Sequence, residues 1–286
     1  MDQAALPIVR TVADLRRQLD AWRAQGQTIG MVPTMGALHE GHLSLIAHAR
    51  QGADRVIASI FVNPTQFAPG EDFDAYPRGE ARDAALLAGA GCDLLFAPGV
   101  VDMYAPGFST AITVSGVSEP LDGHARPTHF SGVATVVAKL LIQARPELAV
   151  FGEKDYQQLQ VIKRLAQDLD LPTAIQGAPT VRADDGLALS SRNAYLTPEQ
   201  RVIAPALYAA LTDLAARLTA GEAVVTAEAQ AADALIAAGF NKIDYIEARH
   251  AEDLSRLGPG AIDGQPARTL GAAWLGKTRL IDNRAV

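Results

Sequence analysis

Cysteine is almost absent from this chain of 286 residues, which contains only Cys92. A single thiol cannot form an internal disulfide, and such a composition is typical of proteins from reducing compartments. The N-terminal stretch carries an acid, Asp2, and lacks the apolar segment of a secretory signal. Charges such as Lys139 interrupt the apolar runs before they reach the ~18 residues of a membrane span. We therefore expect a cytoplasmic protein without a membrane partner.

Basic residues are also in the minority. Lysine and arginine number 25 against 32 acids, so the formal net charge is −7. General nucleic-acid binders usually carry an excess of positive charge, and we therefore expect no nucleic-acid partner. The Gly-x-Ser-x-Gly motif, the Walker box and the Gly-x-Gly-x-x-Gly fingerprint are missing as well. These absences still allow a small anionic ligand to bind at one local site.

Strand-like and helix-like stretches alternate through the first two thirds of the chain. Residues 55–62 (RVIASIFV) form a continuous apolar run, which is typical of a strand covered on both faces. Further strands are expected over 28–32, 93–97 and 148–151, and helices over 12–22, 41–52, 80–90, 130–144 and 154–169. This alternation predicts an α/β fold, a Rossmann-like, doubly wound parallel sheet with helices on both faces.

The pattern changes after residue 180. Two alanine-rich helices are expected over 198–219 and 226–238, followed by strands over 243–249, 268–275 and 278–282. Gly276 and Lys277 would form a tight turn between the last two strands. We therefore predict two domains, a Rossmann-like domain over residues 1–180 and a smaller α+β domain over residues 181–286.

The first segment with chemical character is residues 33–42 (PTMGALHEGH), between a predicted strand and the next helix. Open parallel sheets bind ligands at the carboxyl ends of their strands, and a helix N-terminus suits phosphate. Gly36 and Gly41 would let the backbone approach a ligand, and His39 and His42 would lie on one side of a helical turn. Two surface or capping histidines are the alternative. The zinc-protease box needs histidines four residues apart, so this spacing disfavours zinc.

The second segment is residues 61–67 (FVNPTQF), at the end of the strongest predicted strand. Asn63 and Gln66 carry neutral amides that suit a hydroxyl, a carboxylate or an amine. An ordinary Asn-Pro turn also explains this segment.

Two later segments carry charges and hydroxyls. Residues 151–158 (FGEKDYQQ) follow a strand and contain Lys154, which would reach a phosphate, and Asp155, which would accept from a ribose hydroxyl. A capped helix start is the alternative there. Residues 189–193 (LSSRN) combine two hydroxyls with a guanidinium, which suits a triphosphate, although a plain turn is equally compatible with them.

Together the four segments resemble the pantothenate synthetase (pantoate–β-alanine ligase) family of the nucleotidylyltransferase superfamily. The resemblance covers nearly the whole chain, and its most specific pieces are PTMGALHEGH, FVNPTQF, FGEKDYQQLQVIKR and DGLALSSRNAYL. The first piece is also similar to the His-x-Gly-His signature of the superfamily, and the last to its Lys-Met-Ser-Lys-Ser signature. Residues 100–109 (VVDMYAPGFS) depart from the family's Met-Tyr-Pro sequence, because Ala105 intervenes.

The resemblance implies an ATP-dependent ligase. In that family the carboxylate of pantoate attacks the α-phosphorus of ATP, which gives pantoyl adenylate and pyrophosphate. The amine of β-alanine then attacks the acyl carbon and releases AMP and pantothenate. The resemblance also implies Mg²⁺ with the ATP, a homodimer, and a C-terminal lid domain over an ATP- and pantoate-binding domain.

The resemblance further implies the site residues. His42, His39 and Lys154 are expected to be catalytic, with His42 at the position of the family's proton donor. The expected substrate contacts are Gln66 and Gln158 for pantoate and Gln66 for β-alanine, with Asn63 lining the same pocket. The expected ATP contacts are Met35, Gly36, Ala37, Leu38, His39, Glu40, Gly41, His42, Gly152, Glu153, Lys154, Asp155, Val181, Leu189, Ser190, Ser191 and Arg192.

Two other functions stay open at this point. A nucleotidyltransferase that moves AMP onto a phosphate would share the histidine and serine segments, but would not need Gln66 and Gln158 as a pair. An ATP-binding regulatory module without turnover would not need His39, His42 and Lys154. No metal ligands are assigned, since the nearby acids show no distinctive spacing; these are Asp72, Asp74, Asp83 and Asp122.

Overall fold

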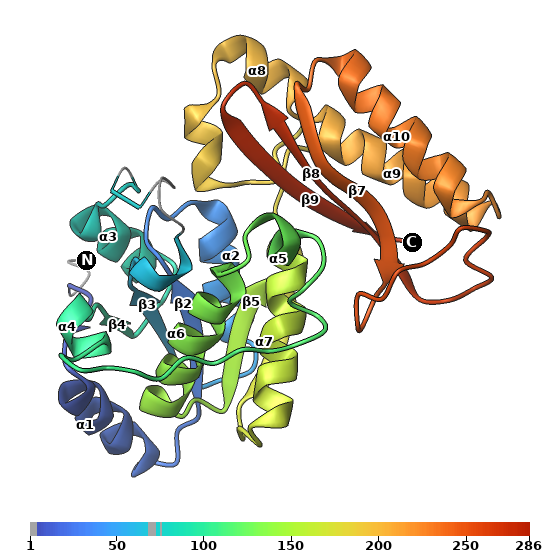
Figure 1. Cartoon of the computed structure of the whole chain (residues 1–286). Coiled ribbons are helices and arrows are strands. Elements are labelled where there is room, and N and C mark those ends of the chain that lie inside the picture. The colour runs from blue at the N-terminus through green and yellow to red at the C-terminus, as the bar shows by residue number, and fades with distance from the viewer. Residues whose placement is uncertain (1–4, 68–72, 75) are drawn as a thin grey trace.

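The computed structural model describes residues 5–67, 73–74 and 76–286, which form two units with a sheet each (Figure 1). The first unit has a six-stranded sheet whose paired strands are all parallel. The second has a three-stranded antiparallel sheet with helices packed on it. The predicted parallel α/β fold with a smaller α+β part is therefore confirmed.

The large sheet has the strand order β1–β4–β3–β2–β5–β6. Its strands are β1 (Ile8–Val9), β2 (Ile29–Thr34), β3 (Arg55–Ile60), β4 (Leu94–Phe96), β5 (Leu148–Gly152) and β6 (Ala174–Ala178). After β2 the chain adds β3 and β4 on one side, and later adds β5 and β6 on the other. The order therefore reverses between β2 and β5, and open parallel sheets bind ligands beyond the carboxyl ends of the strands at such a point.

Helices cover both faces of this sheet. They are α1 (Val12–Arg23), α2 (Glu40–Ala49), α3 (Glu80–Gly89), α6 (His129–Ala144) and α7 (Tyr156–Asp168). Ile57 of β3 packs in a cluster with α1, α6 and α7, whereas Val56 and Ala58 pack in another with α2 and α3. Successive side chains of a strand point to opposite faces, so a strand covered on both faces is apolar throughout.

Short elements escaped prediction because two to five residues carry no measurable periodicity. They are β1, β6, α4 (Val100–Met103), α5 (Asp122–Ala125) and the 3-10 turns η1 (Pro64–Gln66), η2 (Glu153–Asp155) and η3 (Ser191–Tyr195). The helix expected from residue 154 begins instead at Tyr156, because η2 precedes it.

The second unit contains β7 (Lys242–His250), β8 (Ala267–Leu275) and β9 (Thr278–Ala285), in that order. Gly276 adopts a positive φ of 61° in the turn between β8 and β9, as the Gly-Lys pair predicts. Its helices are α8 (Pro198–Ile203), α9 (Ala206–Thr219) and α10 (Val224–Ala238). The prediction of one continuous helix over 198–219 was wrong. The proline ring of Pro205 cannot continue a helix without a lost hydrogen bond, and the chain forms a turn between α8 and α9.

The stretch Pro198–Thr219 has the length and mean hydropathy (1.2) of a membrane-span candidate. Its apolar side chains, however, contribute to the core of the second unit. Leu207, Leu211, Leu214 and Leu218 of α9 are all at most 3% exposed and pack against the small sheet and α10. We therefore interpret α9 as a core helix.

Candidate active site

A cavity of about 990 Å³ opens where β2 and β5 end and where the second unit faces the large sheet. All four predicted segments contribute to its wall. The predicted residues that line it are Met35, His39, Gly41, His42, Gln66, Gly152, Lys154, Asp155, Gln158, Val181, Leu189, Ser190, Ser191 and Arg192. The described residues that line the cavity do not include six others from the prediction, namely Gly36, Ala37, Leu38, Glu40, Asn63 and Glu153.

The loop after β2 is held from behind by α3. Asp83, only 2% exposed, accepts the backbone N–H of Ala37 at 2.9 Å and that of Leu38 at 3.0 Å. Gly36 and Ala37 have positive φ angles of 84° and 53°, a conformation that glycine adopts easily and alanine rarely. The two hydrogen bonds stabilise this turn, so residues 36–38 shape the loop that leads into the histidines.

His39 and His42 cap helix α2 reciprocally. The Nδ1 of His39 accepts the N–H of Gly41 at 3.1 Å, and the Nδ1 of His42 accepts the N–H of His39 at 3.3 Å. Their ring centroids lie 4.1 Å apart. A Cβ on residue 41 would lie 2.9 Å from the His39 ring. Gly41 therefore makes room for the imidazole of His39, and it also lines the cavity, as its position in the sequence suggested.

These hydrogen bonds determine the tautomer of the histidines, and burial determines their charge. Because each Nδ1 accepts a hydrogen bond, the proton of each neutral ring resides on Nε2. Burial, helped by His39 and Lys154, lowers the pKa of His42 from 6.5 to about 3. Burial and the charge of Lys154 also lower the pKa of His39. Both rings are therefore neutral Nε2–H donors at neutral pH.

Asn63 orients Gln66 from behind the cavity wall. Asn63 is 1% exposed, and its Nδ2 donates to Gln66 Oε1 and to the Gly132 carbonyl, each at 3.1 Å. The hydroxyl of Tyr104 donates to Asn63 Oδ1 at 2.8 Å. Gln66 Oε1 is therefore committed to the protein, while its Nε2 lies 3.0 Å from Met35 Sδ at the cavity surface. Through Tyr104, the divergent segment 100–109 supports this arrangement.

The third segment adds a lysine, Lys154, to the cavity that the histidines line. The Nζ of Lys154 lies 3.8 Å from Asp155 Oδ1, and its side chain is 19% exposed. Asn283 of β9 donates to the backbone carbonyls of both Glu153 and Lys154 at 2.9 Å. The turn that carries Lys154 is thus held by the second unit.

The fourth segment continues from a short extended pair. The N–H of Leu189 donates to the Val181 carbonyl at 3.0 Å, which aligns residues 181 and 189 along the cavity. Ser190 Oγ then accepts the N–H of Arg192 at 3.3 Å and starts turn η3. Arg192 enters the cavity wall from this turn.

Several polar residues of the cavity were missed by the sequence analysis. They are His124, Arg126, His129, Lys277, Arg279 and Asn283. The ring of His129 lies at the start of α6, with Nδ1 3.0 Å from the Gln66 carbonyl. The run Arg-Pro-Thr-His directly before a predicted helix was an available signal for two of them. The residues of β9 gave no such signal, since an ordinary strand pattern surrounds them.

The described residues do not include a group of three or more histidine, cysteine or acidic side chains placed to hold a metal ion. Asp83 is used by the loop amides, and Asp122 accepts from Arg279 at 2.6 Å. Asp74 is not among the lining residues, and Asp72 lies outside the described residues. The side chains of the described residues therefore do not by themselves form a resident magnesium site.

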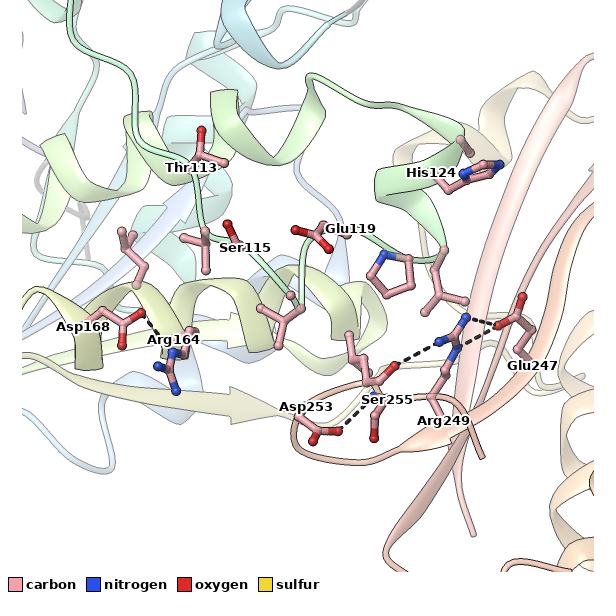
Figure 2. A pocket seen from close by; sticks show the side chains of 18 of the residues that line it. Thr113, Ser115, Glu119, His124, Arg164, Asp168, Glu247, Arg249, Asp253 and Ser255 are labelled. Atoms are coloured by element: carbon pink, nitrogen blue, oxygen red, sulfur yellow. Dashed lines mark hydrogen bonds and ion pairs between the residues drawn. The ribbon is translucent and has the colours of Figure 1, made fainter. Parts of the chain in front are cut away.

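A second cavity, about 1100 Å³, lies between residues 112–121, helix α7 and strand β7 (Figure 2). Four of its charged side chains form two ion pairs: Arg164 with Asp168 at 2.9 Å, and Arg249 with Glu247 at 2.5 Å. The predicted site residues do not line it. We therefore place the candidate active site in the first cavity.

Comparisons with known proteins give matches that extend over nearly the whole chain. The profile of the family described as pantoate-beta-alanine ligase matches residues 7–285. The chain is 65% identical to the pantothenate synthetase of Caulobacter vibrioides over 279 residues, which cover 98% of each protein. It is similar to the crystal structure of the pantothenate synthetase from Thermus thermophilus, with a TM-score of 0.91 and 48% identity over 98% of this chain and 99% of that one. It is also similar to the Francisella tularensis pantoate-beta-alanine ligase complexed with beta-gamma ATP and beta-alanine, with a TM-score of 0.82 and 37% identity over 98% of each chain.

Proposed function

This chain belongs to the pantoate–β-alanine ligase family, and on that premise we propose that it joins pantoate to β-alanine through a pantoyl-adenylate intermediate. The observation that carries the proposal is the convergence of His39, His42, Lys154 and Gln66 on one cavity at the reversal point of the sheet. The ATP- and β-alanine-bound ligase from Francisella tularensis supports the choice of ligands.

In the first step, a carboxylate oxygen of pantoate attacks the α-phosphorus of ATP. The new P–O bond forms as the bond from the α-phosphorus to pyrophosphate breaks, so negative charge grows on the leaving oxygens. Lys154 and the Nε2–H groups of His39 and His42 stabilise that charge, and Arg192 adds a guanidinium from turn η3. No protein nucleophile is needed, because the substrate supplies it.

The histidines act in this proposal as hydrogen-bond donors. In the ligand-free protein, burial lowers the pKa of His42 to about 3, so a neutral Nε2–H ring meets an arriving phosphate as a hydrogen-bond donor. Two neutral donor rings, whose centroids lie 4.1 Å apart, can instead bind adjacent phosphate oxygens through Nε2–H. We therefore assign His42 a hydrogen-bonding role at the position where the family resemblance implies a proton donor.

The amides select and hold pantoate. Gln66 and Gln158 offer neutral donors and acceptors to its hydroxyls and carboxylate, and add no negative charge near ATP. Because Asn63 occupies Oε1 of Gln66, Gln66 offers its Nε2–H to the substrate. A hydrogen bond donated by this Nε2–H of Gln66 stabilises the carboxylate of pantoate or of β-alanine.

In the second step, the unprotonated amine of β-alanine attacks the acyl carbon of the adenylate. A C–N bond forms, the bond from the acyl carbon to the AMP oxygen breaks, and the amine loses a proton to solvent. The second unit, with Ser190 and Ser191 at its edge, covers the cavity and keeps water away from the adenylate.

Magnesium would arrive with ATP and be held mainly by phosphate oxygens and water, as is common for Mg²⁺. Asp155 is the acid of the predicted segments that lines the cavity. Its place beside Lys154 suits a ribose hydroxyl or a water molecule of the ion. The domain boundary between residues 180 and 181, the cytoplasmic location and the homodimer stay predictions.

The test is a coupled assay of AMP and pyrophosphate release from purified protein with ATP, Mg²⁺, pantoate and β-alanine. We expect release to require pantoate, and Lys154→Ala to lower the adenylation rate by ~10²-fold or more, by analogy with lost oxyanion donors. Lys163→Ala, on the exposed face of α7, is the matched control and should retain the full rate.

Three results would separate the alternatives. Release without pantoate but with a phosphate acceptor would indicate a different nucleotidyltransferase. ATP binding without any release would indicate a regulatory module. A Lys154→Ala rate within threefold of the unmodified protein would contradict the role assigned to this lysine.

A further inference from the structure

Asn283 of β9 makes an unusual set of contacts for a strand residue. It is 4% exposed, and its single Nδ2 group donates to the carbonyl of Glu153 and to the carbonyl of Lys154, both at 2.9 Å. Its Oδ1 accepts from Nε of Arg268 at 2.8 Å. The amide therefore uses both donors and its acceptor at once, so its orientation is fixed.

These two carbonyls have a special place in the chain. They belong to the two peptide units on either side of the Lys154 Cα. Peptide units are planar, so the directions of both planes determine φ and ψ at Lys154 and hence the direction of its Cα–Cβ bond. The side chain of Asn283 thus sets the direction of the Cα–Cβ bond of Lys154.

Neighbouring residues of the small sheet brace the same turn. Nη2 of Arg268 lies 3.3 Å from Glu153 Oε2, and its guanidinium stacks 3.7 Å above the ring of Tyr156. The hydroxyl of Tyr156 donates to the Ala251 carbonyl at 2.7 Å. Strands β8 and β9 therefore hold the turn from η2 to the first residue of α7 at several points.

We propose that Asn283 is a positioning residue for adenylation, which aims the ammonium of Lys154 at the phosphates of ATP when the small sheet is docked on turn η2. Aspartate has the same shape but cannot donate and would place negative charge against two carbonyl oxygens. The proposal deepens the proposed function and rests on the role given there to Lys154.

A double-mutant cycle tests the proposal through pantoate-dependent exchange of pyrophosphate into ATP, which reports adenylation alone. We expect Asn283→Ala to lower kcat of exchange by about 10- to 100-fold, the scale expected when a catalytic group is misplaced by about 1 Å. The KM for pantoate should stay within threefold, because the contacts to pantoate are elsewhere. Asn283→Asp should be at least as impaired as Asn283→Ala.

In the Lys154→Ala background, Asn283→Ala should change kcat of exchange by less than threefold, because no ammonium remains to be positioned. Asn241→Ala, an exposed asparagine of the same unit, is the matched control and should leave both proteins unchanged. Thermal unfolding checks that each variant folds. If Asn283→Ala does not fold, Asn283→Ser keeps one donor and should show an intermediate loss with the same dependence on Lys154.

The outcomes distinguish the positioning role of Asn283 from the proposed function. Equal losses from Asn283→Ala in both backgrounds, or a loss confined to the KM for pantoate, would overturn the positioning role. A Lys154→Ala protein that exchanges normally, or an unmodified protein without pantoate-dependent exchange, would instead contradict the proposed function.

Discussion

The tautomers of His39 and His42 depend on which group each Nδ1 contacts. His39 and His42 lie in a helix cap, where each Nδ1 takes a backbone N–H and each Nε2 keeps the proton. In water the same rings would exchange both tautomers and become charged near pH 6.5. The cap thus fixes the tautomer of both rings, and burial keeps them neutral.

This arrangement predicts that His42 does not titrate in the physiological range. Its pKa of about 3 means that ¹⁵N NMR of the free protein should show one neutral Nε2–H ring from pH 5 to pH 8. The unfolded chain takes up a proton near pH 6.5 and the folded chain only near pH 3, so acidification between these values should lower the free energy of unfolding. An inflection of the His42 signal near pH 6.5 would contradict the assignment.

At the scale of single residues, the sequence predicted which residues line the cavity better than it predicted what each side chain contacts. His39, His42, Lys154 and Gln66, singled out from the sequence, all line one cavity of the fold, and their roles stay predictions. The reason for Gly41 could not be predicted, because it depends on where the His39 ring lies after capping. The contact of Asn63 with Gln66 likewise depends on a turn whose amides have several possible partners.

Among the elements, helix α3 has a purpose beyond covering the sheet. Its Asp83 reaches two consecutive N–H groups of the loop after β2, and it thereby stabilises the left-handed turn at Gly36 and Ala37. An element on one face of the sheet thus fixes the entry to the active site.

Asp83→Asn should therefore disturb both folding and ATP use. One amide nitrogen would face a backbone N–H, which leaves a buried donor without an acceptor and should lower the free energy of unfolding by about 1–3 kcal/mol. We also expect a higher KM for ATP, since the loop before His39 loses its support. Urea unfolding and steady-state kinetics measure the two effects. Asp233→Asn, on the exposed face of α10, is the control, and equal stability of the two variants would refute this role of Asp83.

Long elements were predictable because their periodicity extends over several turns or strand residues. Helix α1 starts at Val12 after the Thr11 cap, as expected, with Leu15, Leu19 and Trp22 buried. Turn η2 and strand β6 were not predictable, since they are held by neighbours rather than by their own pattern. The break at Pro205 was predictable, because a proline inside a helical pattern ends or kinks the helix.

The whole molecule is joined by a polar network beside the cavity. Arg279 of β9 donates to Asp122 of α5 at 2.6 Å and to Asp244 of β7 at 2.7 Å, and Tyr245 also donates to Asp122 at 3.1 Å. The side chains of Arg279 and Asp122 are 15% and 11% exposed. The pair connects residues that are 157 positions apart, which is why the sequence could not predict how the units face each other.

Arg279→Met should strongly destabilise the protein, because it leaves two buried carboxylates without their common partner. We expect a loss of about 3 kcal/mol in the free energy of unfolding, measured by urea titration. Adding Asp122→Asn to the Arg279→Met protein should restore part of the lost free energy of unfolding. Arg164→Met removes the exposed pair with Asp168 and should cost below ~1 kcal/mol. Similar losses from the two arginine variants would show that the buried network does not hold the units together.

The hydrogen bonds that Asn283 donates on either side of Lys154 form late in the synthesis of the chain. A ribosome makes residues 33–66 and 151–158 before the strand that carries Asn283. At ~5–20 residues per second, on the order of ten seconds separate residue 158 from residue 283. During that interval the growing chain has the carboxyl edge of its parallel sheet but no opposing wall. Vectorial synthesis therefore delays the completed cavity until the small sheet docks on turn η2.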